Sequence, residues 1–538
     1  MAEEEKAPTT RASAKASDWA VIAAGAAVVV GLAGATAFLG ERAPYVLVAL
    51  AAGGMLVLTV VRPAGSVYFF LTVVMLFREY SLRGHGQREI TTIYNAGLPG
   101  SVTIYAFDLL LLAALGGLLL RAQWKHEPLR IAREGVPLLL FIAIGPLFAV
   151  WGMINGAAFL DAATDYRVAY RAVAVFLLAV TSLRTQRQAI TGAALMVGAG
   201  VLRVLIGDVK FALHHGERYF LGGVNVPVPF IEQADAQVCA LVAVCALAYL
   251  LWPPKVPPLR NLLLAAAVFL MASSTTILTL RRSAWLTMLV GMLVVGLFAI
   301  GRKRTWVMVT GLLVALAVTL VVAGGRTNKL VDIGRVAVRI TAALGEQPQT
   351  GVTSESLHYS ELRDAIANVK AKPVLGWGLG HLLEREASAA VEELLPTPGR
   401  LMRVHDVYLD IWVKMGLVGL GVFLWWVIAT AARSGRRARA MYRERRKLAW
   451  LYGGLFATWI GYLFASLGTT MIFGGNRIGI MFFGVAAVLL VWAAEGQGSR
   501  VEGRGWGKVE RGAGNVENGG EGKRETADAE NGGGGGGE

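Results

Sequence analysis

Apolar segments long enough to cross a lipid bilayer recur along almost the whole chain, from Ala20 to Ala494. A membrane-spanning helix needs about 20 consecutive apolar residues, and only helices or closed barrels satisfy their backbone hydrogen bonds in lipid. The alternating apolar and polar pattern of barrel strands is absent. The composition agrees, because 55% of the residues are hydrophobic and only 17% are charged. The sequence therefore predicts an all-α, polytopic helical membrane protein.

The apolar pattern gives 14 candidate spans, of which the short ones near 66–78 and 171–183 have the weakest signal. We therefore expect about 12 to 14 transmembrane helices. The candidates lie near residues 18–39, 44–61, 66–78, 103–120, 136–157, 171–183, 189–206, 235–252, 261–280, 283–300, 305–324, 406–431, 449–471 and 477–494.

Basic residues between the spans predict how the chain is oriented, because loops rich in Lys and Arg stay in the cytoplasm. Loop 433–447 carries seven Arg and one Lys and is the most basic of these loops. Alternation from this loop places both termini in the cytoplasm and segments 79–102, 207–234, 281–282 and 325–405 outside. The net charge of +15 is thus a sign of membrane topology rather than of nucleic-acid binding.

The predicted spans divide the chain into five parts. They are a cytoplasmic N-terminal segment (1–17), transmembrane helices with short loops (18–324), a large outer loop of short helices (325–405), C-terminal transmembrane helices (406–494) and a Gly-rich cytoplasmic tail (495–538). One short helix is expected from Ser354 to Lys372. The tail has the composition of a disordered segment. The two cysteines, Cys239 and Cys245, lie on different faces of one helix, so neither a disulfide nor a metal site is expected.

A polar run around His405 leads directly into the span 406–431. An imidazole titrates near neutrality and can act as a general base outside the membrane. Asp406 and Asp410 could orient the imidazole or simply cap the helix N-terminus. The alternative is that His405 is an ordinary interfacial residue, and Gly416 and Gly419 fit close helix packing without any chemistry.

Three arginines on the predicted outer side, Arg218, Arg281 and Arg282, work against the positive-inside rule. Guanidinium groups bind phosphate through paired, charge-assisted hydrogen bonds, so these arginines indicate an anion site. The alternative is pairing with nearby carboxylates or lipid headgroups. Asp108, in the outer end of the fourth span, either holds an arginine of the outer cavity or lies at the membrane interface.

Three glycines, Gly376, Gly378 and Gly380, alternate in the run from Pro373 to Gly380. Such a run is a weak signal of a phosphate-binding loop, and the lysine of a Walker motif does not follow it. A tight structural turn against the membrane is the favoured interpretation.

In order and spacing, these motifs resemble the O-antigen ligase and O-antigen polymerase superfamily of bacterial envelope enzymes. The family's His-Asn-x-Tyr-Leu run before a Gly-x-x-Gly helix is similar to His405 through Leu409, with Asp406 in place of Asn. The other matching positions are Arg363 before the glycine turn, Arg281 or Arg282 before Ser283, and Arg218 followed by Gly222 and Asn225. The resemblance covers roughly residues 70 to 490.

The resemblance implies transfer of a glycan from undecaprenyl pyrophosphate to an acceptor hydroxyl on the periplasmic face of the bacterial inner membrane, with inversion and without a metal or other cofactor. The implied roles are His405 as the catalytic base, Arg218, Arg281 and Arg282 as pyrophosphate ligands, and Arg363, Asp406, Tyr408, Asn225 and Asp108 as supporting residues. The acceptor would be lipid A-core in a ligase, a second lipid-linked repeat in a polymerase, or a protein hydroxyl. The expected partners are this donor, this acceptor and membrane lipid, and not nucleic acid.

Two other classes of function compete with the transferase. A transporter for a lipid-linked glycan predicts charges near mid-membrane and internal repeats, and the sequence shows few such charges and no obvious repeat. A scaffold protein would use the basic loop 433–447 and the tail, but a basic inner loop is ordinary membrane topology.

Overall fold

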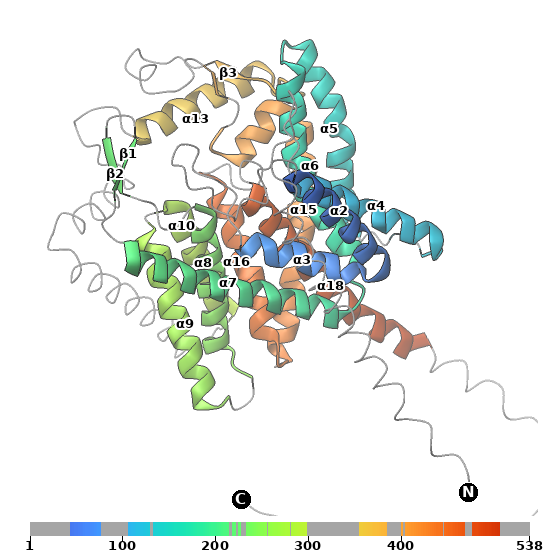
Figure 1. Cartoon of the computed structure of the whole chain (residues 1–538), viewed down its shortest axis with the longest axis vertical. Helices are drawn as coiled ribbons and strands as arrows, with labels where there is room; N and C mark the ends of the chain where they lie inside the picture. Colours follow the sequence, from blue (N-terminus) through green and yellow to red (C-terminus); the bar gives the residue numbers. More distant parts are fainter. Residues whose placement is uncertain are drawn as a thin grey trace, which may run out of the picture. The chain divides into compact units, whose positions relative to one another are not determined.

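The computed structural model of the chain describes residues 43–76, 106–127, 129, 133–214, 218–221, 224–227, 233–254, 257–279, 281–298, 354–384, 400–401, 404–444, 446–468 and 476–505. Within these ranges the regular structure is almost entirely helical (Figure 1), which confirms the predicted fold class. The elements are α2 (Ala43–Val61), α3 (Pro63–Leu76), α4 (Ala106–Trp124), η2 (Arg133–Gly135), α5 (Val136–Ile154), α6 (Phe159–Ser182), α7 (Gln186–His214), β1 (Arg218–Leu221), β2 (Val224–Pro227), α8 (Gln233–Leu251), α9 (Leu259–Leu278), α10 (Arg282–Phe298), α13 (Ser354–Ala371), β3 (Leu383–Glu384), β4 (Arg400–Leu401), α15 (Val407–Arg443), α16 (Ala449–Ala465) and α18 (Asn476–Gly505).

Seven of the described helices are long and apolar enough to cross a membrane, namely Phe107–Trp124, Arg133–Ile154, Gln186–Val209, Ala234–Leu251, Leu259–Ile277, Val407–Arg443 and Arg477–Ala494. Four shorter apolar helices, α2, α3, α10 and α16, coincide with further predicted spans. The predicted spans 18–39 and 305–324 lie outside the described residues. The predicted short span 171–183 is the second half of the 24-residue helix α6. The first half of α6 carries charged residues, which lower the mean hydropathy of the whole helix.

The helices pack around a core of large aromatic rings. Trp426 of α15 stacks on Phe483 of α18 with 4.9 Å between ring centroids, and Trp459 of α16 stacks on Phe482 at 5.3 Å. Small residues bring helices close together elsewhere, since a Cβ added at Gly461 would lie 2.3 Å from a backbone oxygen of α10. Such close backbone approach is typical of helix packing in membranes.

The starts of α8, α10 and α15 and the end of α16 meet at one end of the bundle, which we call the site end. The side chain of Gln237 donates to Oγ of Ser283 at 3.5 Å, and the hydroxyl of Tyr462 donates to the carbonyl of Gln237 at 3.2 Å. The backbone N–H of Val407 donates to the carbonyl of Ser466 at 3.0 Å. These contacts bring the segments that precede α10 and α15 to the same end of the bundle.

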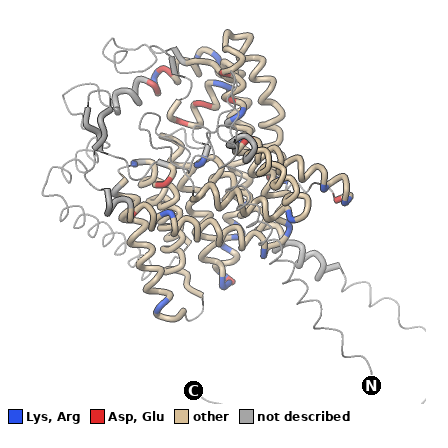
Figure 2. Tube along the Cα trace, in the orientation of Figure 1, with Lys and Arg blue, Asp and Glu red and all other residues tan. Residues whose placement is uncertain are grey.

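The opposite ends of α8, α10 and α15 also meet, at what we call the basic end, which carries residues 433–447. Trp252, directly after α8, packs against Phe298 with 6.1 Å between ring centroids and against Tyr442 with 5.4 Å. Much of the predicted loop 433–447 is helical, because α15 continues to Arg443. Most of the described trace in Figure 2 consists of residues other than Lys, Arg, Asp and Glu, as expected for helices in lipid.

The helix α18 also continues past its predicted end at residue 494, to Gly505. The described stretch from residue 494 to residue 505 belongs to a unit separate from the helix bundle. The rest of the predicted tail, 506–538, lies outside the described residues.

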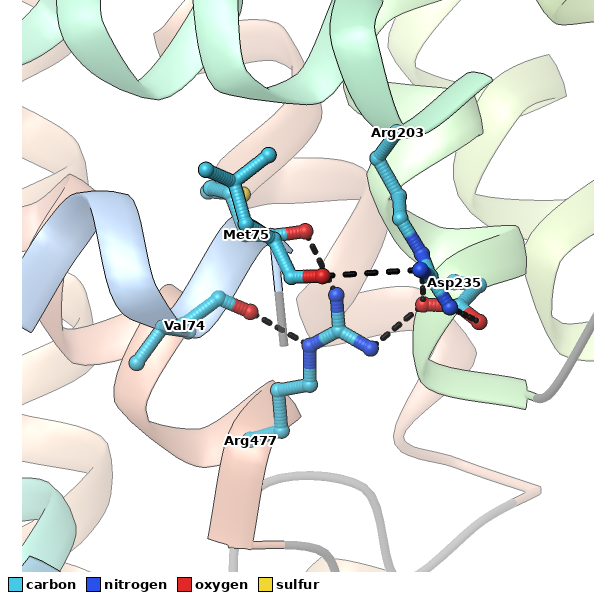
Figure 3. A network of polar contacts seen from close by, with 6 residues as sticks. Val74, Met75, Arg203, Asp235 and Arg477 are labelled. Carbon is cyan, nitrogen blue, oxygen red and sulfur yellow. Dashed lines mark hydrogen bonds and ion pairs between the residues drawn. The ribbon is translucent and has the colours of Figure 1, made fainter. Parts of the chain in front are cut away.

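A buried ion cluster joins four helices near the site end (Figure 3). Arg203 of α7 donates to both carboxylate oxygens of Asp235 of α8, at 2.9 and 2.6 Å, and Arg477 of α18 pairs with the same carboxylate. Arg477 also donates to the carbonyls of Val74 and Met75 in the last turn of α3. The end of a helix carries unpaired carbonyls and partial negative charge, and a guanidinium group satisfies both. The cluster therefore ties the end of α3 and the starts of α8 and α18 to the middle of α7.

Replacing Asp235 by Ala is expected to destabilise the protein by about 3–5 kcal/mol, because removing one partner of a buried ion pair leaves the other charge uncompensated. The measurement is the melting temperature in detergent together with the amount of protein in the membrane. Asp208→Ala is the control, because Asp208 is half-buried on α7 and accepts a hydrogen bond from Thr275 at 2.6 Å. Equal melting temperatures for Asp235→Ala and wild type would contradict this role of the cluster.

Candidate functional site

His405 lies in the short segment before α15, with 49% of its side chain exposed. Its Nδ1 lies 2.8 and 2.9 Å from the two carboxylate oxygens of Glu361, and its backbone N–H donates to the same carboxylate. Glu361 belongs to α13 and is only 3% exposed. A carboxylate on Nδ1 fixes the orientation and tautomer of an imidazole and directs proton exchange to Nε2. The pair therefore has the geometry of a general base with its orienting carboxylate.

The position of Glu361 follows from how α13 packs. Ala365 and Val369 follow Glu361 at intervals of four residues, so the three share one face of the helix. Both apolar residues are buried against Val404 and Val413, which flank the start of α15. The helix agrees with the one expected from Ser354 to Lys372. Glu361 is not among the site residues predicted from the sequence, although its helical spacing to Ala365 and Val369 would have placed it on the packed face.

A buried lysine connects this segment to the rest of the bundle. Lys414 of α15 is 4% exposed, and its Nζ lies 2.9 Å from Asp165 of α6 and 3.1 Å from Asp410. Asp410 accepts a hydrogen bond from the backbone N–H of Val404 at 3.2 Å, and Asp165 accepts one from Gly380 at 2.8 Å. One ammonium group thus holds both the glycine turn and the backbone just ahead of the histidine.

The Lys414 cluster lines a pocket of about 40 Å³ between α5, α6 and α15. This volume suffices for a few water molecules but not for a sugar or a pyrophosphate. We therefore assign the cluster to positioning rather than to substrate binding.

The run from Pro373 to Gly380 forms a tight turn in which the backbone N–H groups of residues 376–380, the glycine-rich part, are already occupied. Four of these N–H groups donate to backbone carbonyls: Gly376 to Lys372 (3.1 Å), Trp377 to Val413 (2.8 Å), Gly378 to Lys414 (2.8 Å) and Leu379 to Phe148 (2.9 Å). The N–H of Gly380 donates to the carboxylate of Asp165 (2.8 Å). A phosphate-binding loop needs N–H groups directed at its ligand. The structural interpretation of this run is therefore correct.

The glycine turn fills a break in α15 at Gly416, which has φ of +62°. A Cβ at Gly416 would lie 2.1 Å from the carbonyl oxygen of Val374, and the carbonyl of Pro373 accepts from Leu417 at 3.0 Å. The expectation that Gly416 serves ordinary helix packing is wrong, because the residue interrupts the helix and admits the turn. The break joins α13, the turn and α15 into one unit around the histidine.

Asp406 caps α15, since its Oδ1 accepts from the backbone N–H groups of Tyr408 at 2.9 Å and Leu409 at 3.0 Å. Burial raises the pKa of the Asp406 carboxyl, and these two N–H groups offset part of the increase. Of the two roles considered for Asp406 the structure shows capping, while Glu361 contacts the imidazole. The hydroxyl of Tyr408 donates to the carbonyl of Leu463 at 3.0 Å and so ties α15 to α16.

Asp406→Asn is expected to keep both stability and activity, because an amide oxygen caps a helix about as well as a carboxylate, whereas Asp406→Ala should cost about 1 kcal/mol. The measurement is the melting temperature of each variant beside its transfer activity. Loss of activity in Asp406→Asn at an unchanged melting temperature would show instead that the charge of Asp406 acts in the reaction.

The predicted arginines are placed only in part. Arg281 is exposed directly before α10, and Arg282 is the first residue of that helix. Arg218 and Asn225 lie on the paired strands β1 and β2, in which Arg218 is opposite Pro227 and Asn225 is opposite Phe220. The side chains of Arg218, Asn225 and Arg282 lie outside the described residues, so their convergence on one anion stays a prediction.

The remaining predicted residues are Asp108 and Arg363. Asp108 is buried and pairs with Arg171 of α6 through both carboxylate oxygens. Among the described residues, an arginine within the bundle thus pairs with Asp108. Arg363 is exposed on α13, two residues after Glu361.

Comparison with protein families gives one match in this region. Residues 266–424 match the model of the family described as O-antigen ligase. The segment that carries the candidate site is thus similar to the O-antigen ligase family. The segment contains α10, α13, the glycine turn, His405 and the first part of α15, so the match covers the candidate site and confirms the resemblance seen in the sequence. The curated proteins gave no match.

Proposed function

We propose that this membrane protein transfers a glycan from undecaprenyl pyrophosphate to an acceptor hydroxyl, with His405 as the general base. The observation that carries the proposal is the exposed His405 imidazole, held at Nδ1 by the buried Glu361 carboxylate, inside the O-antigen ligase segment. An acceptor hydroxyl is a poor nucleophile, and a base positioned at its proton typically contributes 10²- to 10⁴-fold in rate.

In the proposed reaction, Nε2 of His405 takes the proton from the acceptor hydroxyl as its oxygen attacks the anomeric carbon of the donor sugar. The bond from that carbon to the phosphate oxygen breaks, and the pyrophosphate leaves on its lipid with an added negative charge. Attack opposite to the leaving group inverts the anomeric carbon. Arg281, with Arg218 and Arg282, would stabilise the charge of the leaving group, so that no metal ion is needed.

The proposed orientation places the site end in the periplasm and the basic end in the cytoplasm, across the bacterial inner membrane. It rests on the positive-inside rule, since residues 433–447 lie at the end of α15 far from His405. Both termini would then be cytoplasmic, with residues 325–405 forming the outer loop over the site.

The proposed acceptor is lipid A-core, which makes the protein an O-antigen ligase. A polymerase that extends a lipid-linked repeat, or a transferase to protein hydroxyls, would use the same chemistry with another acceptor. Deletion of the gene and gel analysis of envelope glycans distinguish the three. Loss of the whole lipopolysaccharide ladder, with accumulation of lipid-linked polymer, indicates a ligase, and lipid A-core with a single repeat indicates a polymerase. An unchanged ladder would overturn the lipopolysaccharide acceptor.

A further inference from the structure

We propose that a groove between α10 and α15 at the basic end binds an anionic phospholipid through its phosphate group and one acyl chain. The groove has a volume of about 480 Å³, within the range of ligand pockets. Its lining residues are Val294, Leu297 and Phe298 from α10 and Arg439, Tyr442 and Arg443 from α15. The lining thus has an apolar wall on one helix and two guanidinium groups on the other.

The apolar wall suits a hydrocarbon chain. Leu297 is 58% exposed, and it continues the apolar surface of Val294 along α10. Phe298 and Tyr442 both pack against the buried ring of Trp252, at 6.1 and 5.4 Å between centroids. The buried indole of Trp252 thus holds Phe298 of α10 and Tyr442 of α15 in place on the two sides of the groove.

Among the described residues, no carboxylate pairs with either arginine of the groove, Arg439 or Arg443. Elsewhere in this stretch Arg433 pairs with Glu134 and Arg446 pairs with Glu444. In the part of the chain that the structure describes, no ion pair involves Arg439 or Arg443. The two are spaced four residues apart and therefore share one face of α15. Arg439 lies over the ring of Phe298 at 5.9 Å from its centroid, which directs its charge to the edge of the apolar wall.

The position of the groove along α15 corresponds to the level of the lipid headgroups. We place the outer edge of the hydrocarbon core at Leu417, just after the break in α15. From there to Arg439 the helix rises by about 33 Å, slightly more than the hydrocarbon core of roughly 30 Å. The arginines therefore reach the phosphate level of the leaflet opposite His405, where anionic lipids attract basic residues. A phospholipid can contact both sides of the groove, its phosphate the two arginines and its acyl chain the apolar wall. A soluble anion can contact only the arginines.

The test compares binding of phosphatidylglycerol and phosphatidylcholine to the purified full-length protein in detergent, by native mass spectrometry and by melting temperature. The double variant R439Q/R443Q removes the two groove charges. The control R436Q/K447Q removes the same number of exposed charges outside the groove. We expect phosphatidylglycerol to bind the wild type and the control more tightly than phosphatidylcholine, and the groove variant to bind it roughly 30-fold more weakly.

Equal weakening in both double variants would overturn the proposal, because it would show diffuse attraction to the whole basic end. Stabilisation by inorganic phosphate to the same extent as by phosphatidylglycerol would assign the groove to a soluble anion instead and would also overturn it. Neither readout depends on glycan transfer, so the lipid site and the proposed activity are tested separately.

Discussion

His405→Ala is expected to lower the rate of glycan transfer by roughly 10²- to 10⁴-fold, the contribution of a positioned general base. The imidazole is the exposed group of the site, while the carboxylate that orients it is buried. The effect should therefore appear in the rate and not in the amount of protein. In the host, the variant should give the same envelope glycans as a gene deletion.

The stability of His405→Ala should stay close to that of the wild type. Its side chain is half-exposed, and the backbone N–H of residue 405 still donates to Glu361 after the ring is removed. Melting temperature and abundance in the membrane measure this. His126→Ala is the matched control, because His126 is an exposed histidine after α4, outside the candidate site. Transfer at the wild-type rate by His405→Ala would remove the histidine from the mechanism.

Lys414→Met should destabilise the protein by about 3–5 kcal/mol, because it leaves the buried carboxylates of Asp165 and Asp410 without their shared cation. Methionine has a similar volume, so lost packing contributes little. We expect a much lower melting temperature and loss of transfer, since the glycine turn and the segment before the histidine are both held through this cluster.

Two further variants test the electrostatic origin of this effect. Lys370→Met removes an exposed lysine of α13 and should leave the melting temperature unchanged. Adding Asp165→Asn to Lys414→Met removes one of the uncompensated charges and should restore part of the lost stability. An unchanged melting temperature in Lys414→Met alone would show that the cluster does not stabilise the bundle.

The helices could be predicted from the sequence because hydropathy alone marks segments that lie in lipid. The buried charges could not, because one Asp or Arg among many apolar residues barely changes an average over a span. The structure buries three such charges inside the bundle, on Asp165, Arg171 and Lys414. Asp108 pairs with Arg171 and Lys414 lies between Asp165 and Asp410, so these charges connect helices and do not favour the transporter alternative.

The sequence predicts those features of the candidate site that lie within one short segment, but not the contacts between residues far apart in the chain. His405 and the cap residue Asp406 belong to one short motif that can be read directly from the sequence. Glu361 lies 44 residues before His405. The break in α15 at Gly416 is understood only together with the backbone of the glycine turn, which fills it. Contacts of this kind depend on the tertiary fold, and no local pattern specifies them.

The central claim is that Glu361 acts on the reaction through His405. Its most direct test is a double-mutant cycle of Glu361→Ala and His405→Ala, with initial rates of transfer from a lipid-linked glycan measured in proteoliposomes. Residues that act as one unit are strongly non-additive. We predict that each single variant is slow and that the double variant is no slower than His405→Ala alone. A double variant in which the two losses multiply would contradict the claim, because Glu361 would then act independently of the histidine.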